Sequence, residues 1–187
     1  NPESADYLSP GERIAVFDND GNLWAEQPAY FQLQFVLDQL QLLAPAHPEW
    51  LEQQPFKAAI DGDMKALAAS GEAGLLELLL ATHAGMSSAA FAAAVSDWLE
   101  QARHPRFDKP YNELTYLPMR ELLDYLTDNG FTNFIVSGGG VAFMRAWAPA
   151  AYGIPAERII GSRVSIEYVS DEQGARLERR ADIAHIN

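Results

Sequence analysis

The stretch RIAVFDNDGNLW, Arg13–Trp24, constrains the fold of this chain more than any other part of the sequence. Its apolar run Ile14–Phe17 is typical of a short buried β-strand. Asp18 and Asp20 follow at once, and Gly21 comes next. In parallel sheets covered by helices, sites form at the carboxyl ends of the strands. The stretch therefore predicts a strand tip that carries two carboxylates.

A second strand tip is predicted much later, in FTNFIVSGGG, where the apolar run ends at Ser137 and a glycine turn, Gly138–Gly140, follows. One helix is predicted before it, from about Pro118 to Asn129, and one after it, over 141–153. The alternating run Val164–Val169 and a turn at 171–174 indicate β-structure near the end of the chain.

The segment between the two strand tips has a different character. From Pro28 to about Pro110, apolar residues recur at helical spacing, and Ser87 can cap a helix that runs to Arg103. We therefore predict an α/β fold. A Rossmann-like parallel sheet is formed by residues 1–27 and 108–187, and a helical cap, residues 28–107, is inserted after the first strand.

Charge and composition exclude several classes of function. The chain has 13 Lys+Arg against 26 Asp+Glu, a formal net charge of −13, which repels the phosphates of nucleic acids. No apolar run reaches the length of a membrane span, and there is no cysteine for disulfides or thiolate metal sites. Binding of a small anionic substrate would need local positive charge to offset this repulsion, from a metal ion or a nest of backbone N–H groups.

Three interpretations of the aspartate loop compete. An EF-hand needs glycine at loop position six and glutamate at position twelve, whereas this loop has glycine at position four and Ala29 at position twelve. A simple turn is the bland alternative, because Asp, Asn and Gly end many strands. The third is phosphoryl transfer, in which one carboxylate attacks phosphorus, the other moves the proton, and a divalent cation bridges the anions.

FDNDGNLW, followed by FIVSGGG, resembles the haloacid dehalogenase-like hydrolases, and most of all their phosphoserine-phosphatase-like branch. The first stretch is similar to the family motif D-x-D-G-T-L, and the second to the family's strand that ends in Ser or Thr before glycine. The helical block lies where that branch carries its cap. The glycines do not make a dinucleotide turn, since G-x-G-x-x-G would need glycine at Phe143.

The resemblance implies roles for particular residues. Asp18 would be the nucleophile and a Mg²⁺ ligand, and Asp20 would be the general acid/base and give its backbone carbonyl to the metal. The substrate and its phosphate would be bound by the loop and the second strand tip, through Gly21, Asn22, Ser137 and Gly138.

The sequence also departs from the family pattern. Asn22 replaces the usual threonine. After Ser137 there is no lysine, although the family needs one there, and the lysines of the chain are Lys57, Lys65 and Lys109. The late acids, Asp171, Glu172, Glu178 and Asp182, have no apolar strand directly before them. We therefore expect the α/β core to be incomplete at the C-terminus and the natural chain to continue. The alternative is a degenerate domain that binds metal or phosphate without turnover.

Other residues received weaker interpretations. Glu26, just past the loop, could contact a substrate amine or be a solvated hinge charge. Arg103 and Arg106 could reach a substrate anion, although a surface role is favoured. The motif Asp61–Asp63 is expected to start a helix. Trp24 is expected to line the entrance between body and cap, and the histidines, His47, His83, His104 and His185, show no metal-ligand spacing.

Together these observations predict a Mg²⁺-dependent phosphatase that hydrolyses a small phosphorylated metabolite through an aspartyl phosphate. A dehalogenase is disfavoured, because a halide leaving group needs no acid such as Asp20, and a phosphonate hydrolase is a related rival. The chain begins with Asn1, so cytoplasm and periplasm both stay open. The oligomeric state and the physiological substrate are not fixed by the sequence.

Overall fold

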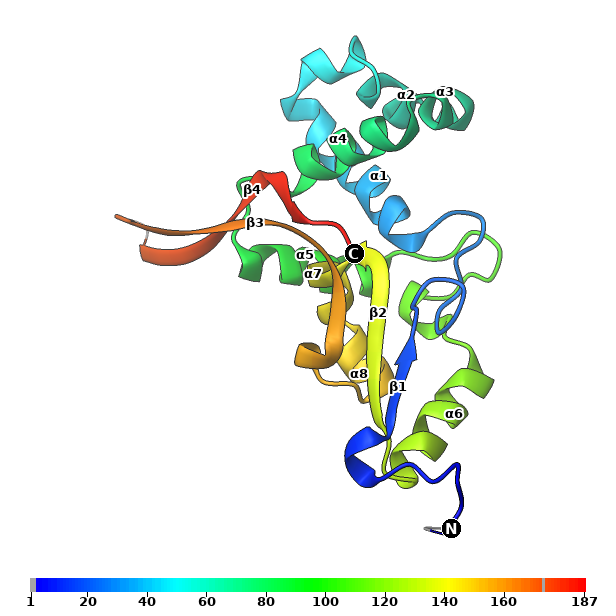
Figure 1. Ribbon diagram of the computed structural model, residues 1–187. Helices are drawn as coiled ribbons and strands as arrows, with labels where there is room; N and C mark the ends of the chain where they lie inside the picture. The colour runs from blue at the N-terminus through cyan, green and yellow to red at the C-terminus, as the bar shows by residue number, and fades with distance from the viewer. Residues whose placement is uncertain (1–2, 173) are drawn as a thin grey trace. The chain divides into compact units, whose positions relative to one another are not determined.

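The structure, a computed structural model, describes residues 3–172 and 174–187 (Figure 1). The chain divides into two compact units. Unit 1 consists of Asn1–Glu26, Ser96–Arg163 and His185–Asn187, and unit 2 of Gln27–Val95 and Val164–Ala184. Residues 164–184, which the sequence analysis assigned to the α/β body, thus cluster with the helices of unit 2. The functional division into a core and a cap over 28–107 stays a prediction.

A parallel sheet forms the centre of unit 1. Strand β1 (Ile14–Phe17) pairs with β2 (Thr132–Gly140), and β2 pairs with the first part of β3 (Ile159–Asp171), both in parallel. The strand order in the whole sheet is β1-β2-β3-β4. A mostly parallel sheet with helices packed on it confirms the predicted α/β fold class (Figure 1).

Three helices of unit 1 pack on one face of this sheet: α6 (Leu117–Asp128), α7 (Val141–Arg145) and α8 (Ala148–Tyr152). Helix α6 is joined to β2 by the Asn133 amide, which donates to the Leu123 carbonyl at 3.0 Å. Helix α7 is joined to β3 by the Arg145 guanidinium, which donates to the Ile159 carbonyl at 2.8 Å. The predicted end of α6 at Asn129 and Gly130 is confirmed, and Gly130 has the positive φ of a helix terminator.

The prediction of one helix over 141–153 is wrong. Trp147 has a non-helical backbone, with φ −137°, and separates α7 from α8. Its indole packs against that of Trp24, with ring centroids 4.1 Å apart. Pro149, in the first turn of α8, has no N–H to donate to the carbonyl four residues earlier, so one continuous helix is disfavoured at this point.

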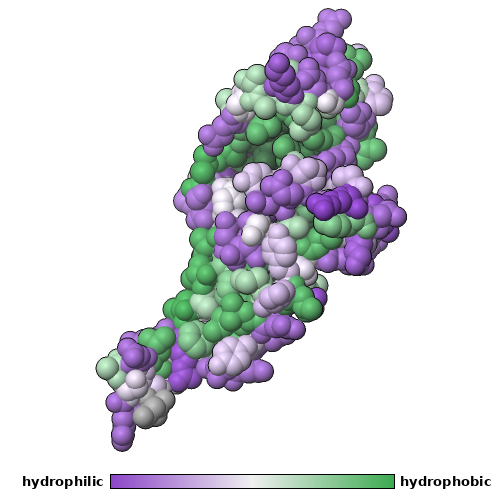
Figure 2. All heavy atoms as spheres, turned by 90° about the vertical axis from the view of Figure 1, so that its right-hand side faces the viewer, coloured by the Kyte–Doolittle hydropathy of each residue, from purple (hydrophilic) through white to green (hydrophobic). Residues whose placement is uncertain are grey.

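The prediction that β1 is buried is also wrong. Ile14 and Val16 are 56% and 59% exposed. Strand β1 is the edge strand of the described sheet, and the face that carries these side chains also carries Ile160, which is 42% exposed. An apolar run shows that a segment is a strand, but not which of its faces is covered. Figure 2 shows other hydrophobic side chains at the surface, interspersed with hydrophilic ones.

Unit 2 is built mainly from helices, as predicted for the inserted block: α1 (Phe31–Leu43), α2 (Phe56–Asp61), α3 (Met64–Ala69), α4 (Gly71–His83) and the first part of α5 (Ser88–Gln101). The Ser87 hydroxyl accepts a hydrogen bond from the Ala90 N–H, which confirms the predicted cap of α5. Asp63 accepts from two N–H groups at the start of α3, which confirms the predicted helix start. The core of the unit gathers Val36, Leu40, Trp50, Phe56, Ala58, Ala59, Leu67 and Leu78.

The outer part of β3 and strand β4 (Gly174–His185) form a long hairpin in unit 2. Side-chain contacts join Ser165 to Asp182, Glu167 to Arg180 and Asp171 to Arg176, so the two strands run antiparallel. The β-structure predicted near the end of the chain is confirmed. The predicted turn includes Gln173, which lies outside the described residues.

Short 3-10 helices complete the described secondary structure, at Pro10–Glu12, Ala44–Ala46, Pro48–Leu51, Tyr111–Glu113 and Ala156–Arg158. Within residues 3–172 and 174–187, no helix is both long enough and apolar enough to cross a lipid bilayer.

Candidate active site

The aspartate loop begins where β1 ends and is held by one buried residue. Asn19 is 1% exposed, and its backbone carbonyl accepts hydrogen bonds from three N–H groups of the loop, those of Asn22, Leu23 and Trp24. Asp18, in contrast, is exposed, and its carboxylate accepts from the Asn19 N–H at 2.7 Å. The fold therefore fixes the loop backbone tightly while it presents the Asp18 side chain to solvent, as a nucleophile requires.

Gly21 closes the loop. It has φ +72°, and its N–H donates to the Trp24 carbonyl at 2.8 Å. A Cβ at this position would lie 2.9 Å from the carboxylate of Glu26, so only glycine fits without a shift. The same contact places Glu26 directly beside the loop. The structure thus brings Glu26 to the candidate site, as the first of its two interpretations requires.

Asp20 is half-buried and carries a perturbed pKa. Burial, followed by the negative charges of Asp18 and Glu26, raises the pKa of the Asp20 carboxyl to about 6. A carboxyl that titrates near neutral pH can both give and take a proton under ordinary conditions. Asp18 has an accessible carboxylate oxygen, and Asp20 can exchange a proton near neutral pH. The two acids therefore differ in the chemistry that they could perform.

Ser137 lies on the neighbouring strand at the same edge of the sheet. Phe17 of β1 pairs with Ile135 of β2, so the chain continues from both positions past the same end of the sheet. Ser137 is 4% exposed, and its hydroxyl accepts a hydrogen bond from the Gly139 N–H at 3.3 Å. Because that bond uses an oxygen lone pair, the hydroxyl proton is still available for a second acceptor.

The prediction of a glycine turn after Ser137 is wrong in detail, because β2 continues through Gly138 to Gly140 with a shift of register toward β3. The residue of β3 that faces this segment, Gly161, must be glycine for close packing. A Cβ on Gly161 of β3 would lie 2.5 Å from the Gly139 carbonyl oxygen. The Ser162 hydroxyl donates to the Gly138 carbonyl at 2.9 Å and ties the glycine segment to β3.

Trp24 does not line an entrance, contrary to the prediction. Its side chain is fully buried at 0% exposure, and its indole N–H donates to the Tyr111 carbonyl at 2.6 Å. The ring also packs against Phe143 and Trp147. Trp24 therefore fixes the end of the aspartate loop in the core of unit 1.

Two further residues support the loop and were not identified from the sequence. They are Asn19 and Tyr152, and the Tyr152 hydroxyl donates to the side-chain oxygen of Asn19 at 3.4 Å. Burial and the charge of Asp20 raise the pKa of Tyr152, so its phenol stays protonated. No sequence signal connects Tyr152 to the loop, because α8 reaches it only through the tertiary fold.

The remaining candidates lie elsewhere. Arg103 and Arg106 are exposed, Arg103 donating to backbone carbonyls of its own helix end and Arg106 lying over the Phe107 ring. Glu178 is ion-paired within the hairpin, and Asp182 contacts Ser165. Asn22 is exposed, and its N–H donates to the Asn19 carbonyl at 3.2 Å.

The donor set of the loop fits Mg²⁺. Within residues 3–172 and 174–187, no group of three or more His, Cys, Asp or Glu side chains is arranged to hold a metal ion. Mg²⁺, however, commonly binds through only one or two carboxylates and completes its shell with water and substrate phosphate. Asp18, Asp20 and Glu26 also concentrate negative charge that raises the pKa of Asp20. A divalent cation would relieve this repulsion.

A family-level comparison covers the part of the chain that holds both strand tips. The sequence profile of the haloacid dehalogenase-like hydrolases (HAD) matches residues 15–185. The chain therefore belongs to the haloacid dehalogenase-like hydrolase family. No curated protein sequence matches the chain.

Three solved structures are similar to this chain to different degrees. A protein of unknown function from Bordetella pertussis Tohama I is similar, with a TM-score of 0.57, 14% identity, and coverage of 91% of this chain and 66% of that one. A phosphoserine phosphohydrolase-like protein from Francisella tularensis subsp. tularensis SCHU S4 has a TM-score of 0.40, 15% identity, and coverage of 94% and 64%. A HAD family hydrolase from Salmonella enterica serovar Typhi has a TM-score of 0.42, 14% identity, and coverage of 91% and 45%. The chain thus spans less than two thirds of the length of the Francisella protein and less than half of the Salmonella one.

Proposed function

We propose that this protein is a Mg²⁺-dependent phosphatase that hydrolyses a small phosphate monoester through a phosphorylated Asp18. The observation that carries the proposal is the difference in exposure and pKa between two acids on one strand tip. Asp18 is exposed, whereas Asp20 is half-buried with a pKa raised to about 6. Membership of a hydrolase family and the neighbouring Ser137 support it.

In the first step, an Asp18 carboxylate oxygen attacks phosphorus and forms a P–O bond. The ester P–O bond breaks, and its electron pair goes to the leaving alcohol oxygen, which takes the proton of Asp20. A pKa near 6 leaves a useful fraction of Asp20 protonated close to neutral pH. The products of this step are the free alcohol and an acyl phosphate on Asp18.

In the second step, water attacks the acyl phosphate and gives a proton to the Asp20 carboxylate. The bond between phosphorus and the Asp18 oxygen breaks, and the electron pair returns to Asp18 as a carboxylate. Inorganic phosphate leaves, and both acids are restored. The same buried position that lets Asp20 act as an acid in the first step lets it act as a base in the second.

Binding of the phosphate is assigned to the remaining loop residues. Ser137 would donate its hydroxyl proton to a phosphate oxygen, beside the Gly138 N–H, and Gly21 and Asn22 would let the backbone approach. Asp18 and the backbone carbonyl of Asp20 would hold Mg²⁺, which when bound offsets the repulsion between phosphate and carboxylate. Glu26, whose carboxylate lies beside Gly21, would bind a positively charged group of the substrate.

The experiment that tests the proposal is hydrolysis of p-nitrophenyl phosphate and a panel of small phosphate monoesters, with Mg²⁺ and with EDTA. Asp18→Asn should abolish turnover. Asp61→Asn is the matched control, because Asp61 belongs to the other D-x-D motif and only forms an exposed ion pair with Lys57. Borohydride reduction of the turning-over enzyme should convert Asp18 to homoserine, detectable by mass spectrometry. Turnover by Asp18→Asn equal to that of the wild type would refute the proposal.

A second candidate function is binding of metal or phosphate without turnover. Residues 138–187 contain no lysine, so this segment supplies no ammonium group for the phosphate or the nucleophile, and that observation favours the second candidate. Isothermal titration calorimetry with Mg²⁺ and inorganic phosphate separates the two functions. Saturable binding by the wild type, no hydrolysis of any monoester and no reducible acyl phosphate would favour the binder.

A further inference from the structure

Arg179 of β4 is a buried cation with no acidic partner among the residues that the structure describes. Its side chain is 5% exposed, and its Nε atom has no hydrogen-bond partner in the described part of the chain. Its guanidinium carbon lies 4.0 Å from the centroid of the Phe91 ring. Burial lowers the pKa of Arg179 to about 10, and no neighbouring carboxylate counteracts that shift. Buried charges in proteins are normally paired, so we expect this arginine to bind an anion.

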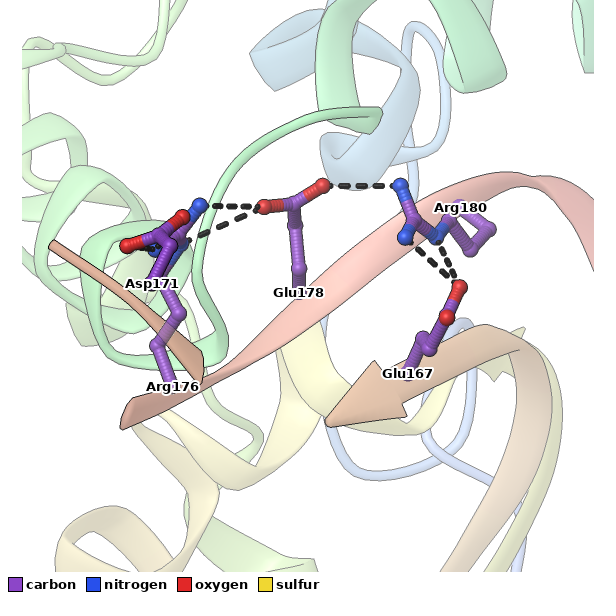
Figure 3. Close-up of polar contacts among 5 residues, drawn as sticks. All are labelled: Glu167, Asp171, Arg176, Glu178 and Arg180. Atoms are coloured by element: carbon purple, nitrogen blue, oxygen red, sulfur yellow. Dashed lines mark hydrogen bonds and ion pairs between the residues drawn. The ribbon is translucent and has the colours of Figure 1, made fainter. Parts of the chain in front are cut away.

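Glu167, Asp171 and Glu178 of the same hairpin pair with other arginines. Figure 3 shows that Glu178 bridges Arg176 and Arg180 on one side of β4, with Nη–Oε distances of 3.0 and 2.8 Å. Arg176 also pairs with Asp171, and Arg180 with Glu167. Arg179 alternates with these residues along the strand and therefore points to the opposite side. The hairpin supplies counterions to two of its arginines and none to Arg179.

The backbone fixes Arg179 beside the start of a helix. Its N–H donates to the Met86 carbonyl and its carbonyl accepts from the Gly85 N–H, both at 2.9 Å. Helix α5 begins two residues later, and the buried hydroxyl of Ser88 in its first turn has no hydrogen-bond partner within the residues described. A helix N-terminus carries partial positive charge, so it adds to the attraction for an anion.

His83 is the third unpartnered polar group of this cluster. It is 1% exposed, and neither ring nitrogen has a hydrogen-bond partner in residues 3–172 and 174–187. Its ring packs edge-on against Phe91, with centroids 4.7 Å apart. Burial and the charge of Arg179 lower the pKa of His83 to about 3, so the ring is neutral and keeps one N–H donor. Three buried donors without acceptors are an unusual concentration in one small region.

We propose that Arg179, Ser88 and His83 form an anion-binding site in unit 2 that takes one carboxylate or phosphate group of a small molecule. The guanidinium presents parallel N–H donors in a fork that matches two oxygens of such a group, and the serine hydroxyl adds another donor. The aromatic ring of Phe91 holds the guanidinium in place. The site lies within unit 2 and does not depend on the proposed phosphatase chemistry.

The test is a titration of the full chain, labelled with ¹⁵N-arginine, in EDTA at constant ionic strength. Inorganic phosphate and acetate are the two probes, which separates a phosphate site from a carboxylate site. The Arg179 Nε–H resonance, identified by its loss in Arg179→Gln, should shift saturably with at least one probe. Ser88→Ala should weaken the affinity about five- to tenfold, because one hydrogen bond is lost.

Two controls locate the effect. Arg180→Gln should leave the affinity unchanged, because Arg180 is ion-paired on the other side of β4. Asp18→Asn should also leave it unchanged, which separates this site from the aspartate loop. An Arg179 resonance that stays in place with both probes, or the same affinity in Ser88→Ala as in the wild type, overturns the proposal. If Arg179→Gln does not fold, the loss of the resonance in Arg179→Lys gives the assignment, and the comparison of Ser88→Ala with the wild type still decides.

Discussion

Replacement of Asp20 by asparagine should stabilise the metal-free protein at neutral pH, although the same change removes the proposed acid/base. The pKa of Asp20 is raised from 3.8 to about 6, mainly by burial and then by the charges of Asp18 and Glu26. The folded state therefore holds the Asp20 proton more tightly than the unfolded state does. The stability from this group is full below pH 3.8 and is lost as the pH rises through 6.

The magnitude follows from the shift. At about 1.4 kcal/mol per pKa unit, full ionisation of Asp20 costs the folded state up to about 3 kcal/mol. Asp20 is only half-buried, so we expect about 1–3 kcal/mol. Asparagine is nearly the same size, carries no charge and avoids this cost. The difference in unfolding free energy between Asp20→Asn and the wild type should grow between pH 4 and pH 7.5, in favour of the variant.

Urea unfolding in EDTA, followed by tryptophan fluorescence at half-unit pH steps, measures this difference. Asp61→Asn is again the control, because Asp61 is exposed and ion-paired with Lys57, and its loss should give no gain at pH 7.5. Addition of Mg²⁺ at pH 7.5 should stabilise the wild type more than Asp20→Asn. A stability difference that is the same at pH 4 and pH 7.5 would refute the electrostatic account of Asp20.

Three other changes test the structure. Gly21→Ala should lower the free energy of unfolding by about 1–3 kcal/mol, since φ is +72° and the new Cβ would meet the Glu26 carboxylate; Glu26→Ala in the same chain should recover part of the loss in urea unfolding. The pKa of His83 is about 3 in the folded state and about 6.5 in the unfolded state, so protonation below pH 6.5 favours the unfolded state. The free energy of unfolding of the wild type should therefore fall by up to about 1.4 kcal/mol per pH unit below pH 6.5. Acid unfolding of His83→Phe should not show this contribution. Trp24→Phe should cost about 1–2 kcal/mol in thermal unfolding, because the Tyr111 carbonyl loses its buried donor.

Local features of the chain could be predicted well from the sequence. The strand before Asp18, the cap at Ser87, the helix start at Asp63 and the helix end at Gly130 all depend on residues close together in the chain. Strand periodicity and helix capping depend on only a few neighbouring residues, so both can be recognised in the sequence without knowledge of the fold. The candidate acids were found for the same reason, because both lie in one short motif.

Features that depend on distant contacts could not be predicted. The indole of Trp147 packs against that of Trp24, more than a hundred residues earlier, and the Tyr152 hydroxyl likewise reaches Asn19 across the chain. The exposure of Ile14 depends on which helices cover the sheet.

The sequence by itself determined the α/β class and the acid pair of the loop, because strands, turns and motifs depend on residues that are close together in the chain. Only the tertiary structure decided which groups are buried and what surrounds them. Arg179 stands in a charged run that reads as a solvated strand, yet pairing with the segment before α5 buries it against Phe91. The pKa of Asp20 likewise rises because folding removes water and brings Glu26 beside the loop. Burial and electrostatics are properties of the assembled fold, since both depend on residues far apart in the chain.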